Sequence, residues 1–308
     1  MTTVSIQPTY HCNLRCSYCF LGKWRNKSEI LDLNILEQKL QEIKNYVNID
    51  TIDLYGGEIS ILDPQYLRNL FRLCLEYCQN VNVTSNLANI QIFNILKEFP
   101  SIKLAVSLNW ERKDFSRIKE LLDSKQYKID NILTVALPHL LNNNIKETLD
   151  LYQKWNLPVS IFRYKPSLLN SFFNISVQQY ENFIIEFIKQ YISGNYTFPL
   201  NNLIELKNGK NIPLLSSSIF ITPEGKYCWI DHFRNKEMYL CSDEITGWLS
   251  SAQVDYLSYR HKCKDCPFFG FCLAEHLDFE DINEQYCCGL KNLMKWWLEE
   301  GAYLKWNI

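Results

Sequence analysis

Three cysteines lie close together near the start of this 308-residue chain, at Cys12, Cys16 and Cys19. Thiolates bind zinc and iron-sulfur clusters, and three at this C-x3-C-x2-C spacing can hold three irons of a cubane cluster. One iron would then stay open to bind a small molecule. Zinc sites usually close with four ligands, and no fourth is near in the sequence. We therefore favour a [4Fe-4S] cluster, with zinc or a redox pair as the alternatives.

Nine further cysteines make a total of 12, and no secretory signal precedes them. Metal ligands or catalytic thiols explain such a set better than disulfides do. The run Cys263-x2-Cys266-x5-Cys272, followed by Cys287 and Cys288, predicts a second metal centre, either an iron-sulfur cluster or a structural zinc knuckle. Cys74 and Cys78 stand four residues apart on one predicted helix, where we expect buried free thiols.

The elements that must position the first motif follow a regular pattern. Short apolar runs alternate with amphipathic ones, which is typical of repeated βα units and a parallel sheet. The expected strands are Thr3–Gln7, Thr51–Tyr55, Val81–Thr84, Lys103–Ser107, Ile132–Leu137 and Val159–Arg163, and the clearest helices are Asp32–Val47, Pro64–Gln79, Ile145–Trp155 and Val177–Ile192. Six units predict a partial (β/α)6 TIM-like barrel, open and with its site at the carboxyl ends of the strands.

The pattern changes after about residue 200. Short strands and turns follow, then a cysteine-rich stretch and a final helix near Gly289 to Glu300. We therefore predict two domains in this α/β chain, the barrel over residues 1–200 and a small iron-sulfur domain over residues 201–308.

Composition excludes several classes of function. The chain has 32 basic and 34 acidic residues, so no basic surface for nucleic acid or membrane is expected. The sequence contains neither a signal peptide nor an apolar stretch long enough to span a bilayer. We expect a cytoplasmic protein that binds neither nucleic acid nor membrane.

Small and polar residues follow the predicted strands. Gly56-Gly57-Glu58 comes after the second strand, Thr84-Ser85-Asn86 after the third, and Ser107 and Asn109 after the fourth. Glycines allow close approach of backbone, and a carboxylate such as that of Glu58 suits an ammonium group. Arg163 ends the sixth strand and is interpreted either as a partner for a carboxylate or as a surface cation.

With these motifs in order, the first 165 residues resemble the radical S-adenosylmethionine superfamily. Tyr18 matches the aromatic residue before the family's last cysteine. The resemblance implies that Gly56, Gly57 and Glu58 bind the methionine amino group of the cofactor, and that Asn86 belongs to a Thr-Asn-Gly-like segment, with Leu87 in place of the glycine. It also implies that Ser107 and Asn109 offer polar groups to the ribose and the carboxylate of the cofactor. The cysteines would then be catalytic, because their cluster cleaves S-adenosylmethionine to a 5'-deoxyadenosyl radical.

Residues 219 to 290 resemble the SPASM extension, which binds auxiliary [4Fe-4S] clusters in peptide-modifying radical enzymes. The family's fourth cysteine in C-x2-C-x5-C-x3-C is His276 here. We expect at least one auxiliary cluster, on Cys263, Cys266, Cys272 and either Cys287 or Cys288. A second cluster, drawing on Cys228, Cys241 and the leftover thiol, is left open.

The resemblance predicts an oxidoreductase for maturation of a ribosomally synthesised peptide, with a side-chain cross-link of cyclophane or thioether type as the favoured product. Peptide epimerisation and radical dehydrogenation or rearrangement of a small molecule are the alternatives within the enzyme class. An iron-sulfur electron carrier or sensor is the alternative outside it. Expected partners are a precursor peptide and an electron donor such as flavodoxin or ferredoxin. Because the predicted barrel begins at residue 3, we expect either a separate leader-recognition protein or direct capture of the leader by this chain.

Overall fold

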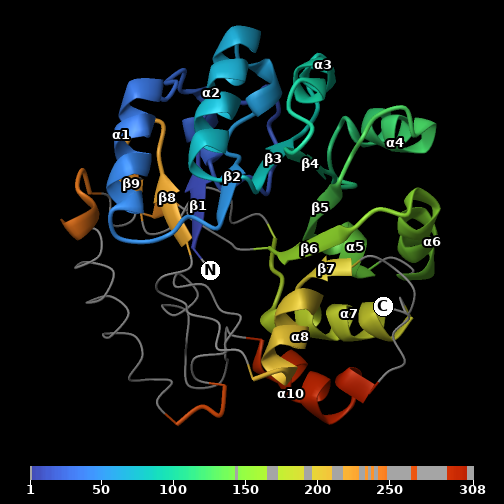
Figure 1. Cartoon of the computed structure of the whole chain (residues 1–308). Helices are drawn as coiled ribbons and strands as arrows, with labels where there is room; N and C mark the ends of the chain where they lie inside the picture. The colour runs from blue at the N-terminus through green and yellow to red at the C-terminus, as the bar shows by residue number, and fades with distance from the viewer. Residues whose placement is uncertain are drawn as a thin grey trace.

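The structure is a computed structural model, and it describes residues 2–142, 145–164, 173–190, 196–209, 218–228, 233–234, 237–238, 242–247, 265–268 and 290–303. Strands and helices alternate along the first two thirds of the chain (Figure 1). The strands of the main sheet are β1 (Thr3–Ile6), β2 (Thr51–Leu54), β3 (Val81–Ser85), β4 (Lys103–Ser107), β5 (Asn131–Ala136), β6 (Val159–Arg163), β7 (Tyr196–Phe198), β8 (Ser218–Ile221) and β9 (Tyr227–Cys228).

The sheet is mainly parallel and follows chain order. Its strands run β7-β6-β5-β4-β3-β2-β1-β8-β9. All six predicted strands are present and pair in parallel, which confirms the α/β class and the parallel core of the predicted partial barrel. Two strands that were not predicted extend this core, because β7 pairs in parallel with β6 and β8 in parallel with β1. Among the strands that the structure describes in this sheet, β9 alone runs antiparallel, in a hairpin with β8.

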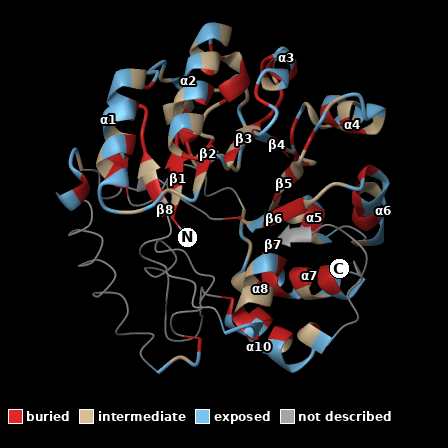
Figure 2. Cartoon of the chain, in the orientation of Figure 1, coloured by how far each residue is buried: buried red, intermediate tan, exposed pale blue. Residues whose placement is uncertain are grey.

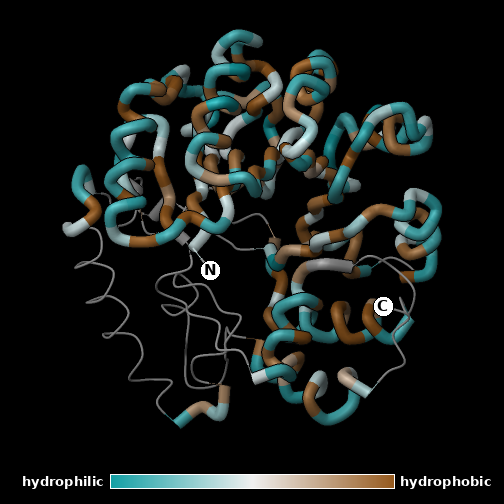
Figure 3. The backbone as a smooth tube through the Cα atoms, in the orientation of Figure 1, coloured by the Kyte–Doolittle hydropathy of each residue, from teal (hydrophilic) through white to brown (hydrophobic). Residues whose placement is uncertain are grey.

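Helices cover one face of the sheet (Figure 1). Their bounds are α1 (Leu33–Lys44), α2 (Pro64–Tyr77), α3 (Ile92–Lys97), α4 (Phe115–Ser124), α5 (Pro138–Asn142), α6 (Ile145–Trp155), α7 (Val177–Gln190), α8 (Leu200–Lys207) and α10 (Lys291–Glu299). Asp32 and Asp63 cap α1 and α2 by accepting hydrogen bonds from backbone N–H groups of the first turn, and Pro64 begins α2. The buried faces of these helices meet the strands, while their outer faces are exposed and polar (Figures 2 and 3).

Alternate strand residues face the helices, as the pleat requires. Val4 and Ile52 are fully buried in the core shared with the helices. Ser5, Asp53 and Asn82 lie side by side in register on the other face of β1, β2 and β3. The Asn82 amide donates a hydrogen bond to Asp53 over 2.7 Å, and burial raises the pKa of Asp53. The face of the sheet away from the helices is therefore polar across β1, β2 and β3.

Two described elements of the last part of the chain contact the barrel at different places. β8 forms the sheet neighbour of β1, and α10 packs against α7. At the second place Glu181, a buried residue of α7, accepts hydrogen bonds from the backbone N–H groups of Asn292 and Leu293 at 2.9 and 3.1 Å. Both elements lie in the segment assigned to the second domain, so these described parts of that segment pack on the first. The boundary near residue 200 stays a prediction.

No helix among the described residues is long and apolar enough to cross a bilayer.

Candidate active site

The loop that carries the three cysteines leaves the carboxyl end of β1 and folds back on itself. The Cys12 N–H donates to the Arg25 carbonyl at 3.1 Å, and the Cys19 N–H donates to the Cys16 carbonyl at 3.2 Å. Arg25 also donates from its guanidinium to the Cys16 carbonyl at 3.1 Å. The short helix η1 (Gly22–Asn26) closes the loop. We call residues 10–27 the cysteine loop, and it brings the three thiols to one end of the sheet.

The three thiols are half-buried and free of disulfides. Burial raises the pKa of Cys12 to about 12, and neighbouring Glu58, Cys19 and Cys16 add to the effect. Burial also raises the pKa values of Cys16 and Cys19, although the positive charge of Arg112 partly offsets the shift at Cys16. A bound metal cation lowers the pKa of a buried thiol, because the positive charge stabilises the thiolate form.

Gly56 and Gly57 hold the end of β2 against the cysteine loop. The Gly57 N–H donates to the Thr9 carbonyl at 2.9 Å, and the Glu58 N–H donates to the His11 carbonyl at 2.7 Å. A Cβ atom at Gly57 would lie only 2.1 Å from the His11 carbonyl oxygen. Gly56 adds a φ of +133°, which residues with side chains rarely adopt. The glycines are therefore needed for the backbones to meet just before Cys12.

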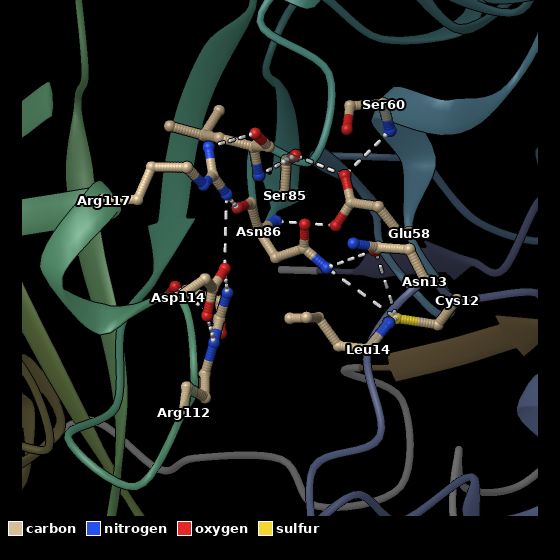
Figure 4. Close-up of polar contacts among 12 residues, drawn as sticks. Cys12, Asn13, Leu14, Glu58, Ser60, Ser85, Asn86, Arg112, Asp114 and Arg117 are labelled. Carbon is tan, nitrogen blue, oxygen red and sulfur yellow. Dashed lines mark hydrogen bonds and ion pairs between the residues drawn. The ribbon is translucent and has the colours of Figure 1, made fainter.

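Glu58 lies beneath this contact and is almost fully buried, with 1% of its surface exposed. Its carboxylate accepts hydrogen bonds from the Ser60 N–H at 2.9 Å and from the Ser85 hydroxyl. Its second oxygen accepts from the Asn86 N–H at 2.6 Å (Figure 4). The carboxylate therefore joins the ends of β2 and β3. The predicted contact between Glu58 and a cofactor ammonium stays a prediction.

Asn86 connects the end of β3 to the first cysteine. Its side-chain amide donates to the Asn13 side chain at 3.1 Å and lies 3.7 Å from the Cys12 sulfur (Figure 4). Its Oδ1 atom is buried without a hydrogen-bond partner, and so are both polar atoms of the Gln7 side chain, which follows β1. Buried polar atoms normally find a partner. These unpaired groups are available to a bound molecule.

Leu87 occupies the position where the resembling family has glycine. Its φ is +57°, in the left-handed region that glycine adopts without strain. The side chain is fully buried in the core, so packing stabilises a leucine in a conformation suited to glycine. The chain therefore adopts a left-handed backbone conformation here although a side chain is present.

A buried ion pair, which sequence reasoning missed, supports the end of β4. Arg112 donates to both oxygens of Asp114 at 2.8 and 2.6 Å and to the Ser107 carbonyl and hydroxyl at 2.6 and 3.1 Å. Arg117 donates to the Asn86 and Leu87 carbonyls (Figure 4). Burial alone would raise the pKa of Asp114, but Arg112 outweighs it and the pKa is lowered. The available signal in the sequence was the spacing of these charges after β4, since Asp114 stands two residues after Arg112 and three before Arg117.

The remaining predicted cofactor residues follow β4 and β6. The Asn109 side-chain amide donates a hydrogen bond to the Val135 carbonyl at 2.8 Å. Its oxygen accepts one from the Val135 N–H at 3.4 Å. Ser107, the last residue of β4, accepts hydrogen bonds from Arg112. Arg163 ends β6, near Tyr180 of α7, whose pKa is raised by burial and lowered in part by Arg163. The strand order therefore brings the residues after β1 to β4 together, with Arg163 two strands beyond β4.

Two of the predicted auxiliary ligands lie among the described residues. Cys228 is fully buried on β9, and Cys266 is half-buried against the core. Cys241, Cys263, Cys272, Cys287, Cys288 and His276 lie outside the described residues. Within the described part of the chain no three histidine, cysteine or acidic side chains gather as they would around a single metal ion.

The fold and this site define an α/β protein that has a three-cysteine loop at the carboxyl end of its first parallel strand. Residues 6–134 match the Radical SAM superfamily. The matched residues include the three-cysteine loop and the glycines after β2.

Solved structures give the same fold. The chain is similar to anSMEcpe, solved with bound AdoMet and a Cp18Cys peptide, with a TM-score of 0.72, 14% identity and coverage of 98% of this chain and 96% of that one. It is also similar to SuiB of Streptococcus suis bound to the precursor peptide SuiA, with a TM-score of 0.66, 18% identity and coverage of 93% and 74%. No curated protein matches the sequence.

A match to the Radical SAM superfamily implies a [4Fe-4S] cluster and S-adenosylmethionine as cofactors. The residues present fit both. The donor set is three thiols on one short loop, which suits a cluster with one open iron. The unpaired oxygen of Asn86 and the unpaired amide of Gln7 lie on segments next to that loop and suit a small polar molecule.

Proposed function

We propose that Cys12, Cys16 and Cys19 hold the catalytic [4Fe-4S] cluster and that S-adenosylmethionine binds beside them, over the ends of β1 to β4. The observation that carries the proposal is the contact of Gly56 and Gly57 with the backbone just before Cys12, since it fixes the cysteine loop against the next strand. Gly56, Gly57, Glu58, Asn86, Ser107 and Asn109 form or support the wall of the cofactor site, and Arg163 lies farther along the sheet. The bound cofactors would supply a carbon-centred radical that removes hydrogen from a substrate.

We propose that the substrate is a ribosomally synthesised peptide and that the product is a side-chain cross-link. Support comes from the fold, which over more than nine tenths of the chain follows that of two proteins solved with bound peptides. A cross-link joins two atoms that each lose a hydrogen. One leaves as a hydrogen atom to the radical, and the other leaves as a proton with one electron, for which an auxiliary cluster in residues 201–308 is the proposed acceptor.

The first experiment tests the cluster. Iron and sulfide are measured on anaerobically reconstituted protein, together with electron paramagnetic resonance and release of 5'-deoxyadenosine from S-adenosylmethionine. We expect about eight irons per chain in the intact protein, and about four in a variant with alanine at Cys12, Cys16 and Cys19, which should release no nucleoside. The matched control replaces Cys74 and Cys78, two buried thiols of the α2 segment. Zinc in place of iron, or equal nucleoside release from both forms, would reject the proposal.

A second experiment tests the peptide. Candidate short peptides encoded beside this gene are coexpressed with the enzyme and analysed by mass spectrometry. A cross-link lowers the peptide mass by a pair of hydrogen atoms, whereas epimerisation in deuterated water leaves the bond pattern unchanged and adds deuterium. A peptide that is unaltered in both respects would contradict the peptide proposal.

A further inference from the structure

The turn between β8 and β9 packs tightly on the barrel. It is closed by hydrogen bonds from the Gly225 N–H to the Thr222 carbonyl at 2.9 Å and from the Thr222 N–H to the Lys226 carbonyl at 3.0 Å. Gly225 has a φ of +75°, and a Cβ atom there would lie 2.3 Å from a side-chain carbon of Ile35 in α1. The turn is therefore fixed in place against α1, directly after the strand that pairs with β1.

Glu224 extends from this turn to the cysteine loop. The Tyr10 hydroxyl donates a hydrogen bond to Glu224 Oε2 at 2.7 Å, and Lys27 Nζ lies 3.8 Å from Glu224 Oε1. Tyr10 stands two residues before Cys12 and is fully buried, while Lys27 follows the short helix that closes the loop. One carboxylate thus contacts both ends of the segment that carries the three cysteines.

Aromatic packing connects this contact to a cysteine. Lys27 Nζ lies 3.7 Å from the centre of a Trp24 ring, and the rings of Tyr10 and Trp24 meet edge to face with centres 5.9 Å apart. Tyr10 and Leu21 form a small buried core against which Cys19 and Trp24 pack. A change at Glu224 would therefore reach Cys19 through Tyr10.

We propose that Glu224 is a positioning residue for the cluster, which it serves by holding the two ends of the cysteine loop together. The inference rests on the proposed cluster. It means that the extension after β8 forms part of the catalytic cluster site. A carboxylate suits this place because a charged acceptor bonds the tyrosine hydroxyl and also attracts Lys27.

The test uses the full-length protein with Glu224→Ala, Glu224→Gln, Tyr10→Phe and the double variant Tyr10→Phe/Glu224→Ala. Glu29→Gln is the matched control, because Glu29 Oε1 also lies 3.8 Å from Lys27 Nζ. On reconstituted protein we measure the rate at which a ferrous chelator removes iron, and the electron paramagnetic resonance of the reduced cluster. On metal-free protein we measure hydrogen exchange of the backbone amides of residues 10–27.

We expect Glu224→Ala and Tyr10→Phe to speed iron loss about tenfold, as loss of a charged hydrogen bond predicts. Their signals should broaden relative to the wild type. Glu224→Gln keeps the acceptor for Tyr10 and should restore most of the retention, and the double variant should be no worse than the worse single one. Iron loss from Glu224→Ala equal to that from Glu29→Gln, or additive effects of the two singles, would overturn the proposal.

The exchange measurement separates this inference from the proposed function. If the wild type bound no iron, the proposed function would fail. Glu224 would still be shown to hold the loop if Glu224→Ala exchanged the loop amides about tenfold faster than Glu29→Gln did. Equal exchange in the two variants would overturn the positioning role as well.

Discussion

The carboxylate of Glu58 lies 2.6 Å from the backbone nitrogen of Asn86 and binds the ends of two neighbouring strands together. Glu58 is buried, yet its charge is satisfied by two N–H groups and one hydroxyl. Burying a carboxylate is costly unless hydrogen-bond donors surround it, and these three donors meet that need. The same residue lies under the glycines that contact the cysteine loop, so the geometry of the site depends on it before any cofactor binds.

We expect Glu58→Ala to lower the free energy of unfolding of the metal-free protein by at least about 3 kcal/mol, because it leaves buried donors without a partner. Glu58→Gln should lower the free energy of unfolding by less than Glu58→Ala does, but still by more than about 1 kcal/mol. The reason is that the new side-chain amide would face donors that already point at this position. Urea unfolding followed by circular dichroism measures both. The control is Glu98→Gln, which removes a charge from an exposed pair with Arg68 and should change stability much less. A Glu58→Ala protein as stable as this control would contradict the structural role.

Gly57→Ala should displace the cysteine loop, because the added methyl group would lie 2.1 Å from the His11 carbonyl oxygen. We expect a loss of stability of about 1–3 kcal/mol and a marked fall in iron retained after reconstitution. The control is Gly209→Ala, where φ is +69° but no atom lies within 4 Å, so only the backbone strain of about 1 kcal/mol applies. The measurement is the iron content of both variants after reconstitution. Equal iron retention would show that the close contact between Gly57 and His11 is not needed to hold the cluster.

Sequence periodicity predicted the barrel well, because its strands are apolar and its helices amphipathic. The predicted strand Lys103–Ser107 agrees with β4 at both ends. Strand β8 was not assigned to the barrel, since its four residues carry no local sign that they pair with β1. In the site, the cysteine spacing and Gly56-Gly57 were readable from sequence. The partners of Glu58 and the contact between Tyr10 and Glu224 were not, because 214 residues separate the second pair and only the fold brings them together.

The stability of the protein should depend on pH through Asp123 of α4. Hydrogen bonds from Lys119, Lys154 and the Trp155 ring hold the pKa of Asp123 well below its usual value. A lowered pKa in the folded state adds stability above the unfolded-state pKa of about 3.9, and this contribution is lost as the pH falls toward the folded-state value. Asp123→Asn should therefore cost about 1 kcal/mol at pH 7 and progressively less below pH 4.

Urea unfolding of the wild type and Asp123→Asn at several pH values between 7 and 3 measures that difference. The control is Asp150→Asn, which removes one exposed pair with Lys146 and should have a smaller effect. A difference between wild type and Asp123→Asn that stays constant over the whole range would show that the ion pairs of Asp123 do not stabilise the fold.

Glu181 should anchor the C-terminal helix to the barrel. Its carboxylate accepts hydrogen bonds from two backbone N–H groups at the start of α10. It accepts a third from the side-chain amide of Asn292 at 3.0 Å. Helix starts leave such N–H groups unpaired, and a negative charge there is favourable. Glu181→Ala should therefore lower stability by about 1–3 kcal/mol and speed hydrogen exchange across residues 291–299 more than elsewhere. Glu186→Ala, which removes an exposed carboxylate of the same helix α7, is the control. If α10 exchanged at the same rate in both variants, core packing through Leu293 and Trp297 would hold the helix without the cap.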